Sequence, residues 1–403
     1  MVYGLNYQGS KNKIADWVLE HLPPAQTFVD VFGGGGAITH AAMLSGKYRN
    51  FVFNDLNPLC QCFARAARGE YSDERLSRFI DRETFKNTYN VDEIAFFCYS
   101  FGSKGNTYIY AKELEPFKRA LHDARVFGDY SALKEMGCQS AQRKWIFDNC
   151  EEVKHRYTDW YLRNVMKTQL SFDDFKGKLQ KQIADRNEEL RQYLISALKA
   201  SGLKNQREVG RRLGTNMERH YFGKSQWQFP TAEAYAQMQT FMPLPREYET
   251  LFLLEDSGAD IRSLISLEQL SSFYSLEHWQ NITRLRGLRG LRGLRGLRGL
   301  RGTYSDMQIP DDAVIYCDPP YAETTGYKIE DFDHGKFYDW ALHQTNIVVI
   351  SEYSMPTPDF VPVAAKKVVC TMSAFSNSKV AVEKLFVPQH QLERYNKMIG
   401  FLF

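Results

Sequence analysis

Three short segments of this 403-residue chain carry residue types that suit the binding of a nucleotide and of an amino group. The first is a run of four glycines, residues 33–36, between the apolar segment 27–32 and a helical pattern. Glycines at this junction carry no Cβ atom that would keep a ligand from the strand end or the helix N-terminus. The run therefore predicts a nucleotide-type pocket at the carboxyl edge of a sheet. It is neither a G-x-G-x-x-G pattern nor a P-loop, because no Lys-Ser/Thr pair follows.

An acidic residue ends the next predicted strand. Asp55 closes the apolar segment 50–55 and lies 25 residues after Asp30, the acid of the first strand. A carboxylate at this place can accept hydrogen bonds from both ribose hydroxyls of an adenosine-containing ligand. An acid there is often only a strand-end cap, but the preceding glycine run favours the ribose role.

The third segment is Asp318-Pro319-Pro320-Tyr321, directly after the apolar run 313–317. Two prolines keep the backbone extended and supply no N–H, so their carbonyl oxygens face outward as fixed acceptors. A carboxylate, a carbonyl and an aromatic face together suit an amino group on a flat base. The acceptors align the amine, and the ring stacks on the heterocycle.

These segments require strands that end at one edge of a sheet. Residues 27–32, 50–55 and 313–318 are predicted as buried parallel strands. Strands and helices alternate, which predicts an α/β fold with a doubly wound sheet and an antiparallel pair at its C-terminal edge. The other predicted elements are strands at 346–351, 367–372 and 380–387 and helices at 13–21, 37–45 and 334–343.

Between the two parts of this sheet the pattern changes. Residues 65–284 show helical periodicity and many aromatic residues, with no comparable buried strand. Residues 173–201 are predicted as one amphipathic helix that ends at Gly202. We therefore predict a catalytic domain in two parts, 1–64 and 303–403, interrupted by a helical insertion.

Six perfect Leu-Arg-Gly triplets fill residues 285–302. Their six arginines exceed the net charge of +3, so the rest of the chain carries −3 and the total charge says little about nucleic acid. A period of three matches neither helix nor strand, and glycine disfavours a helix by about 1 kcal/mol per position relative to alanine. We predict a length-tolerant linker; an arginine-rich contact to the DNA backbone is the alternative.

In combination, these segments resemble the Dam-type DNA adenine-N6 methyltransferases, which use S-adenosylmethionine (SAM). The glycine run is similar to the family's SAM-binding FxGxG loop, Asp55 to its ribose acid, and residues 318–321 to its catalytic DPPY motif. Residues 7–11, Tyr-Gln-Gly-Ser-Lys, resemble the N-terminal motif, whose aromatic residue and lysine contact the methionine moiety. Residues 304–306 resemble the segment that touches the cofactor adenine, and residues 373–383 are similar to the C-terminal hairpin.

The resemblance implies a Rossmann-like methyltransferase sheet, split in sequence by a mostly helical DNA-recognition domain. It also implies that Asp318 and the Pro319 carbonyl hold the N6 amine of a flipped-out adenine in duplex DNA, which attacks the methyl group of SAM directly. The catalytic residues that it implies are Asp318, Pro319, Pro320 and Tyr321, the last as the ring that stacks on the base. The cofactor-binding residues that it implies are Tyr7, Lys11, Asp30, Phe32, Gly33, Gly34, Gly35, Gly36, Asp55, Asp306 and Asp318.

Sequence recognition is predicted in the helical insertion. Residues 199–226 contain seven Lys or Arg residues against two Glu, and two helices broken near Gly214 would resemble a helix-turn-helix. Polar residues that read base edges accompany them, and a solvated basic face is the alternative. These polar residues are Asn205, Gln206, Asn216 and His220.

The loop at 98–110 is a second candidate contact with DNA. Lys104 would meet phosphate, and Tyr99 or Tyr108 would support flipped DNA; a loop packed on its own aromatic rings is equally consistent with the sequence. The full set of predicted DNA-binding residues is Lys104, Arg207, Arg211, Arg212, Asn216, Arg219 and Lys224.

Three other activities remain compatible with these motifs. The DPPY motif also occurs in RNA base methyltransferases, which act on guanine N2 or adenine N6, although the Lys11 motif and the large insertion favour DNA. Cytosine-N4 methylation usually has Ser in place of the Asp. An inactive DNA-binding homologue would require the loss of SAM binding, yet every expected cofactor residue is present.

The composition, 43% hydrophobic and 25% charged, is typical of a globular protein, and no run of 18 apolar residues occurs. The N-terminus has no apolar signal core, so we expect a cytoplasmic protein of a prokaryote or phage. The seven cysteines form no C-x-x-C pair, and neither a metal site nor a disulfide framework is predicted. We expect a monomer that acts on double-stranded DNA, with no membrane partner and with a cognate restriction endonuclease as a compatible partner.

Overall fold

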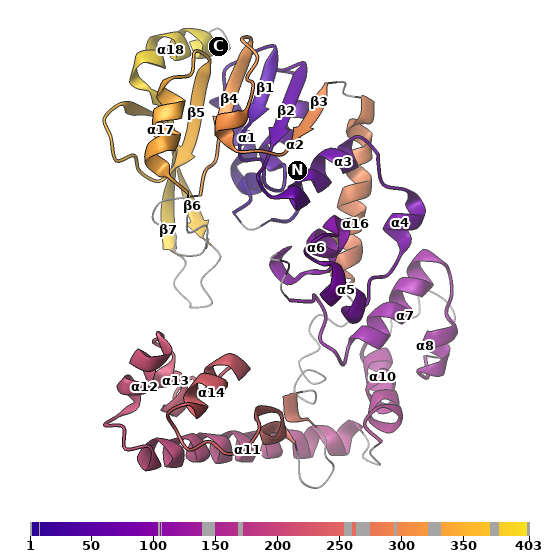
Figure 1. Cartoon of the computed structure of the whole chain (residues 1–403). Helices are drawn as coiled ribbons and strands as arrows, with labels where there is room; N and C mark the ends of the chain where they lie inside the picture. The colour runs from indigo at the N-terminus through magenta and orange to yellow at the C-terminus, as the bar shows by residue number, and fades with distance from the viewer. Residues whose placement is uncertain are drawn as a thin grey trace. The chain divides into compact units, whose positions relative to one another are not determined.

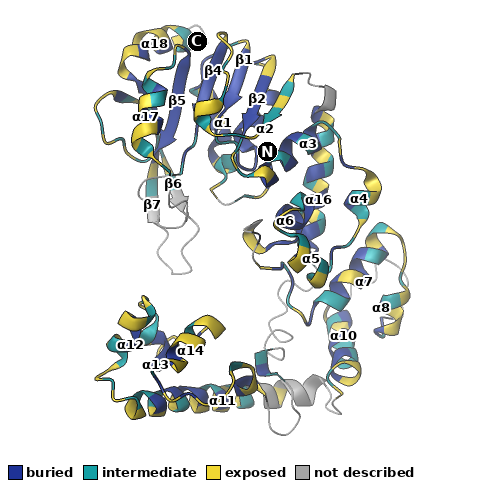
Figure 2. Ribbon diagram, in the orientation of Figure 1, coloured by how far each residue is buried: buried dark blue, intermediate teal, exposed yellow. Residues whose placement is uncertain are grey.

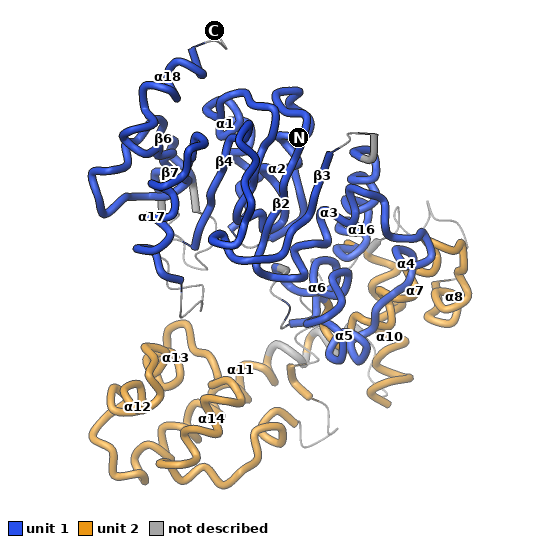
Figure 3. The backbone as a smooth tube through the Cα atoms, turned by 45° about the horizontal axis from the view of Figure 1, so that its top comes forward, with its two compact units in different colours: residues 1–109, 276–403 blue, residues 110–275 orange. Residues whose placement is uncertain are grey.

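The computed structural model divides the chain into two compact units (Figure 3). The sheet unit comprises Met1–Ile109 and Leu276–Phe403, and the helical unit, which is inserted between them, comprises Tyr110–Ser275. The residues that the structure describes are 2–7, 9–103, 105, 107–138, 150–167, 172–253, 260–262, 275–293, 296–320, 332–370 and 379–400.

Among the described residues, the sheet has seven strands in the order β3-β2-β1-β4-β5-β7-β6 (Figure 1). The first five in this order are parallel neighbours, whereas β7 is antiparallel to both β5 and β6. The antiparallel edge predicted from the sequence is therefore confirmed. The strands are β1 (Thr27–Asp30), β2 (Asn50–Asn54), β3 (Leu297–Leu300), β4 (Ala313–Cys317), β5 (Ile347–Glu352), β6 (Phe360–Cys370) and β7 (Lys379–Pro388).

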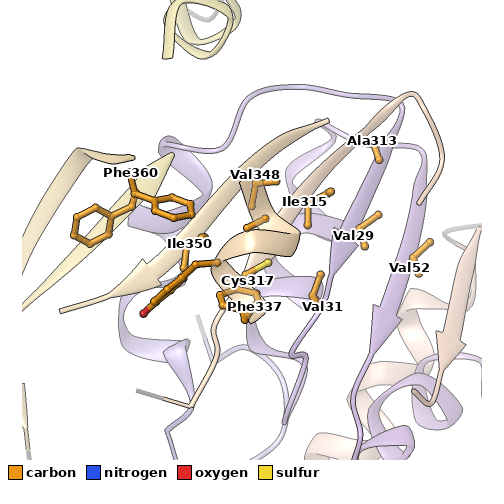
Figure 4. Packing of buried hydrophobic residues seen from close by; sticks show 13 residues of the cluster. Val29, Val31, Val52, Ala313, Ile315, Cys317, Phe337, Val348, Ile350 and Phe360 are labelled. Atoms are coloured by element: carbon orange, nitrogen blue, oxygen red, sulfur yellow. The ribbon is translucent and has the colours of Figure 1, made fainter. Parts of the chain in front are cut away.

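The central strands are buried along their whole length, as Figure 2 shows for β1, β4 and β5. Alternate side chains such as Val29, Ile315 and Val348 pack with Phe337 of α17 (His334–Leu342) on one face (Figure 4). On the other face α2 (Ala37–Ser45) packs against β1 and β2. Because helices cover both faces, the apolar runs form a doubly wound α/β sheet, as predicted.

Helices from both ends of the predicted insertion pack within the sheet unit. α3 (Gln61–Ala67) and α6 (Glu93–Tyr99) both contact α16 (Glu277–Leu288). Asn281 of α16 donates a hydrogen bond to the Phe97 carbonyl at 3.2 Å. The helical unit is therefore shorter at both ends than the predicted segment 65–284. The boundaries differ because helices that cover a sheet and helices that form their own core have the same periodicity in the sequence.

The Leu-Arg-Gly repeat is not a linker, and the structure corrects this prediction. Its first residues end α16, the next form the 3-10 helix η5 (Arg289–Gly293), and β3 pairs in parallel with β2 at the edge of the sheet. Leu285 and Leu288 are buried, which explains why leucines at this spacing fold onto the sheet unit. A Cβ atom at Gly299 would lie 2.5 Å from Gln61 Oε1 and 3.1 Å from the Cβ atom of Ala64 on α3, so a side chain at this β3 position would force Gln61 to move.

The helical unit has its own hydrophobic core. α11 (Phe172–Ala200) confirms the predicted long helix, and Gly202 follows it with a φ of +73°. Leu194 of α11 packs with Val209, Tyr221 and Tyr235 of the next three helices. The other elements of this unit are α7 (Glu115–Val126), α8 (Ser131–Glu135), α10 (Cys150–Asn164), α12 (Gln206–Leu213), α13 (Glu218–Phe222), α14 (Ala232–Gln239) and η4 (Tyr248–Phe252).

The remaining elements of the sheet unit are short. They are η1 (Lys11–Ile14), α1 (Ala15–Glu20), η2 (Pro58–Cys60), α4 (Asp73–Ser77), α5 (Arg82–Thr88), η3 (Phe101–Ser103), η6 (Tyr304–Asp306), η7 (Gln389–Gln391) and α18 (Leu392–Gly400). In the part of the chain that the structure describes, no helix has the length and apolar character needed to cross a membrane.

Candidate active site

Three carboxylates follow three neighbouring strands at one edge of the sheet. Asp30 is the last residue of β1, Asp55 follows β2, and Asp318 follows β4. Because β2, β1 and β4 are adjacent and parallel, their carboxyl ends lie side by side. Burial raises the pKa of Asp30 to about 7, and the charges of Asp318 and Asp55 add to this effect. The topology thus gathers acids that are far apart in the sequence.

The glycine run between β1 and α2 is packed against the protein itself. The Gly34 N–H donates to Oδ2 of Asp55 at 2.8 Å, and a Cβ atom at Gly34 would lie 3.0 Å from the ring of Tyr7. Gly36 precedes α2 with a φ of +73°, and a Cβ atom there would lie 2.3 Å from the Phe63 ring. These glycines therefore have an internal packing role besides the ligand access that the sequence suggested.

Asp30 is almost fully buried and only half satisfied. Its Oδ2 accepts a hydrogen bond from Thr39 Oγ1 on α2 at 2.6 Å. Its Oδ1 is buried and has no hydrogen-bond partner among the described residues. A buried acceptor left without a donor costs about 1–3 kcal/mol. The arrangement therefore suits a donor, above all a cationic one, that is not part of the chain.

Asp55 is held by the backbone on both of its oxygens. Oδ2 accepts from Gly34, and Oδ1 accepts from the Asn57 N–H at 2.8 Å. Burial raises the pKa of Asp55, whereas these two backbone hydrogen bonds oppose the shift. Each carboxylate oxygen has a second lone pair, so the fixed carboxylate keeps acceptor capacity for hydroxyl groups of a ligand.

The ammonium group of Lys11 lies against the predicted catalytic acid. Lys11 Nζ is 2.8 Å from Asp318 Oδ1 and 3.7 Å from Glu383 Oε1. Burial by itself lowers the pKa of Lys11, but the charges of Asp318 and Glu383 outweigh it and raise the pKa above its ordinary value. The resemblance of residues 7–11 implied a cofactor role for Lys11, and no spacing along the chain connects Lys11 with Asp318 or with Glu383.

The two prolines after Asp318 are described, whereas Tyr321 lies outside the described residues. Pro319 is buried, and the Pro320 carbonyl lies 2.8 Å from Nε2 of His334, the first residue of α17. Since a carbonyl oxygen only accepts, His334 donates from Nε2. This contact fixes the extended backbone of the motif. Nothing in the sequence pattern marked His334, because its partner lies 14 residues earlier in the chain.

An aromatic cluster surrounds Phe32, the residue before the glycine run. Its ring centroid lies 5.4 Å from Phe337, 5.8 Å from Phe332 and 6.1 Å from Tyr304. Segment 304–306 therefore reaches the edge of the sheet through Tyr304. Asp306, the residue predicted from this segment, is exposed and accepts a hydrogen bond from Thr303 Oγ1 at 2.8 Å. Sequence reasoning missed Tyr304 as the residue that joins the cluster.

The loop at 98–110 does not present the tyrosines that the sequence analysis proposed. Tyr99 and Tyr108 are buried and stacked on each other, and Tyr99 also stacks on His278 at 4.7 Å. They therefore support the loop from inside, and their proposed contact with flipped DNA is wrong. The exposed ring is that of Phe101, with 69% of its surface accessible. Lys104 lies outside the described residues.

The basic segment 199–226 forms two helices separated by a short turn, as predicted. α12 ends at Leu213 with Gly214 in the left-handed conformation (φ +63°), and α13 begins at Glu218. α13 has only five residues, so it is shorter than the groove-reading helix that a helix-turn-helix would supply. The predicted contact residues in this segment are all exposed: Arg207, Arg211, Arg212, Asn216, Arg219 and Lys224.

Two of the proposed base-reading residues in this segment have structural roles. Asn205 caps α12, because its side chain accepts from the Arg207 N–H at 3.0 Å. His220 is buried, with Nδ1 3.2 Å from the Gln226 carbonyl. His220 therefore does not face a groove of DNA, which corrects that prediction. Among the described residues, no group of three His, Cys, Asp or Glu side chains is arranged to hold a metal ion.

The seven-stranded, mostly parallel sheet with helices on both faces is consistent with a Rossmann-like methyltransferase fold. Residues 7–197 match the model of the D12 class N6 adenine-specific DNA methyltransferase family. This match confirms the family that the motifs indicated, and with it an enzyme of the adenine-specific DNA methyltransferase type. It covers the glycine run and Asp55 and ends within α11, before the segment that carries Asp318. A comparison with curated proteins found no match.

Proposed function

We propose that this enzyme transfers the methyl group of SAM to the N6 amine of an adenine that is flipped out of duplex DNA. One observation carries the proposal. Asp318, whose carboxylate is paired with Lys11, follows β4, and β4 lies next to β1, the strand that ends in Asp30. Asp55 follows β2, on the other side of β1. An acceptor for the adenine amine and acceptors for the cofactor would therefore share one edge of the sheet. A methyl transfer between two bound molecules needs this proximity.

The residues at this edge fit SAM, which supplies a methyl group on a sulfonium centre when it is bound. Asp55 would accept from the ribose hydroxyls. The unpartnered Oδ1 of Asp30 would accept from the ammonium group of the methionine moiety. The rings of Phe32 and Tyr304 would pack on the adenine of the cofactor.

Asp318 and the carbonyl of Pro319 would align the adenine amine. Asp318 accepts a hydrogen bond from N6 and acts as an orienting acceptor rather than as a strong base, because the proton can leave after the methyl group has been transferred. The ammonium group of Lys11, 2.8 Å from Oδ1, forms an ion pair with this carboxylate and restricts its orientation. The rate enhancement then comes mainly from orientation and from fixed charges.

Recognition of DNA would rest on groups outside this edge. The adenine amine is hidden in the base pair, so the base must leave the duplex at a cost of a few kcal/mol. The exposed cations of 199–226 would neutralise phosphates, and the exposed Phe101 would contact unstacked bases.

The test is a transfer assay with methyl-labelled SAM and duplex DNA of varied sequence. We expect label at adenine N6 within one short sequence motif. Expression in a host free of DNA methylation, followed by long-read sequencing, would identify that motif. Label in RNA alone would support the RNA methyltransferase alternative, and the absence of label in any adenine would refute the proposal.

A further inference from the structure

A buried glutamate on β7, Glu383, is linked to Asp318 at the carboxyl edge of the sheet, because Lys11 contacts both carboxylates. Glu383 has only 3% of its surface exposed, and its Oε1 lies 3.7 Å from Lys11 Nζ. The same ammonium group is 2.8 Å from Oδ1 of Asp318. Lys11 is therefore placed between two carboxylates, one that follows β4 and one on β7.

Glu383 also accepts a hydrogen bond from β5, the strand that lies between β4 and β7. Ser351 on β5 donates from Oγ to Oε1 of Glu383 at 2.6 Å, and Ser351 is fully buried. β5 lies between β4 and β7 in the sheet, with Ser351 opposite Leu385. Since side chains alternate along a strand, Glu383 and Leu385 lie on one face, the face of Ser351. The position of Glu383 is thus set by the sheet.

We propose that Glu383 is a positioning residue for methyl transfer: it holds the Lys11 ammonium group, which in turn fixes the orientation of the Asp318 carboxylate. This inference rests on the proposed function of Asp318. The physical reason is that the buried ammonium group of Lys11 has lost most of its hydration. A single carboxylate partner would not fix the position of this group. With Glu383 as a second partner, the ammonium group has two carboxylates that restrict where it lies, and it is 2.8 Å from Oδ1 of Asp318. A misplacement of about 1 Å at such a site can cost about 100-fold in rate.

Other titratable groups act on the same cluster. Tyr353 raises the pKa of Lys11, after the larger effects of Asp318 and Glu383. Glu352 at the end of β5, with its pKa raised to about 7 by burial, also interacts with Asp318, Glu383 and Lys11. Tyr316 on β4 interacts with Asp318, Glu383 and Asp30. The pH dependence of kcat must therefore be compared between variants that retain Tyr353, Glu352 and Tyr316.

The first test compares Glu383→Gln with Lys384→Gln. Lys384 is the next residue of β7 and points to the opposite face of the sheet, so its variant controls for changes in the strand. We expect Glu383→Gln to lower kcat about 10-fold to 100-fold, with KM for SAM and for DNA within about 3-fold of the wild type. Lys384→Gln should retain the wild-type kcat. An unchanged kcat in Glu383→Gln, or a loss confined to KM, would overturn the proposal.

The pH profile separates positioning from a structural role. Loss of the Glu383 charge lowers the pKa of Lys11, so the alkaline fall of kcat should begin at a lower pH in Glu383→Gln. Ser351→Ala, which removes one hydrogen bond to Glu383 and keeps its charge, should shift the profile in the same direction by less. Identical alkaline limbs in all three proteins would contradict the proposal.

Titration of Lys11 by NMR, in protein with ¹³C-labelled lysine, gives a readout that needs no catalysis. Lys11→Met identifies the signal. We expect Lys11 to lose its proton at a lower pH in Glu383→Gln than in the wild type, and an unchanged titration would refute the contact. If the wild type transfers no methyl group, the proposed function fails by itself, while this titration still decides whether Glu383 controls Lys11. Should Glu383→Gln fail to fold, Ser351→Ala carries both measurements.

Discussion

The carboxyl edge of the sheet and the basic segment 199–226 carry their charges in opposite ways. At the edge, Asp30 and Glu383 are buried, Asp318 is half-buried, and each has a partner within the protein. In the basic segment, Arg207, Arg211 and their neighbours lie on the surface of α12 and beyond. A buried charge interacts strongly with a group a few ångströms away, so its orientation matters. Exposed cations interact with DNA phosphates as a group, and salt screens this attraction.

This difference separates chemistry from recognition in measurable terms. Loss of a group at the edge should change catalysis or cofactor affinity while the salt dependence of DNA binding stays the same. Loss of exposed cations should change DNA affinity and its salt dependence, while the catalytic step on bound DNA stays intact. Each of the following variants tests one side of this contrast.

The largest effect is expected for Asp318→Ala. Removal of the carboxylate leaves the adenine amine without its orienting acceptor and leaves Lys11 with an incomplete set of partners. We expect kcat to fall by about 1,000-fold or more, with SAM affinity within about 3-fold, measured by transfer of labelled methyl groups and by calorimetry. Asp311→Ala, an exposed acid before β4, is the control and should be fully active. Full activity of Asp318→Ala would remove this residue from the mechanism.

Asp55→Ala should act on the cofactor. The variant removes the ribose acceptor and also the carboxylate that holds Gly34 and Asn57, so both the ligand and the loop are affected. We expect SAM affinity to fall about 10-fold to 100-fold by calorimetry, with DNA affinity retained. The exposed Glu74→Ala serves as the control. If SAM binds equally well without Asp55, the nucleoside lies elsewhere on the edge.

The double variant Arg211→Ala with Arg212→Ala tests the basic side. Two lost phosphate contacts should reduce the slope of log K against log salt by about 2 and lower DNA affinity about 10-fold at moderate salt. Arg163→Ala with Lys167→Ala removes two exposed cations from the region of α10 and provides a control with the same change in charge. A slope that is unchanged in the first variant would move DNA recognition to another surface.

The smallest effect is expected for a change inside the repeat. With the chain fixed at η5, deletion of residues 294–296 brings Leu300, Arg301 and Gly302 to positions 297–299, so glycine stays at the position of Gly299. We expect nearly wild-type activity and a small decrease in melting temperature.

With the chain fixed in the same way, deletion of only residues 295–296 brings Arg301 to the position of Gly299, places its side chain against Gln61 and should lower the melting temperature more strongly. Equal melting temperatures for the two deletions would show that β3 does not depend on register.

Much of the fold and of the site follows from local patterns. The apolar runs that end in Asp30, Asp55 and Asp318 predict parallel strands, and the order of motifs predicts the family. The sequence did not predict β3, because an edge strand made of Leu-Arg-Gly triplets has neither an alternating nor a continuous apolar pattern. It also did not place Tyr99 and Tyr108, because exposure of an aromatic ring depends on what packs against it.

What the sequence determined by itself is therefore the chemistry that residues close together along the chain can express: the strand–glycine–helix run, the Asp-Pro-Pro-Tyr segment and the basic helices. What only the tertiary structure decided is which distant groups meet. Lys11, Asp318, Ser351 and Glu383 come from four separate segments, and no spacing along the chain relates them. They meet because strand order and register place β4, β5 and β7 side by side, and both are set by packing of the whole sheet.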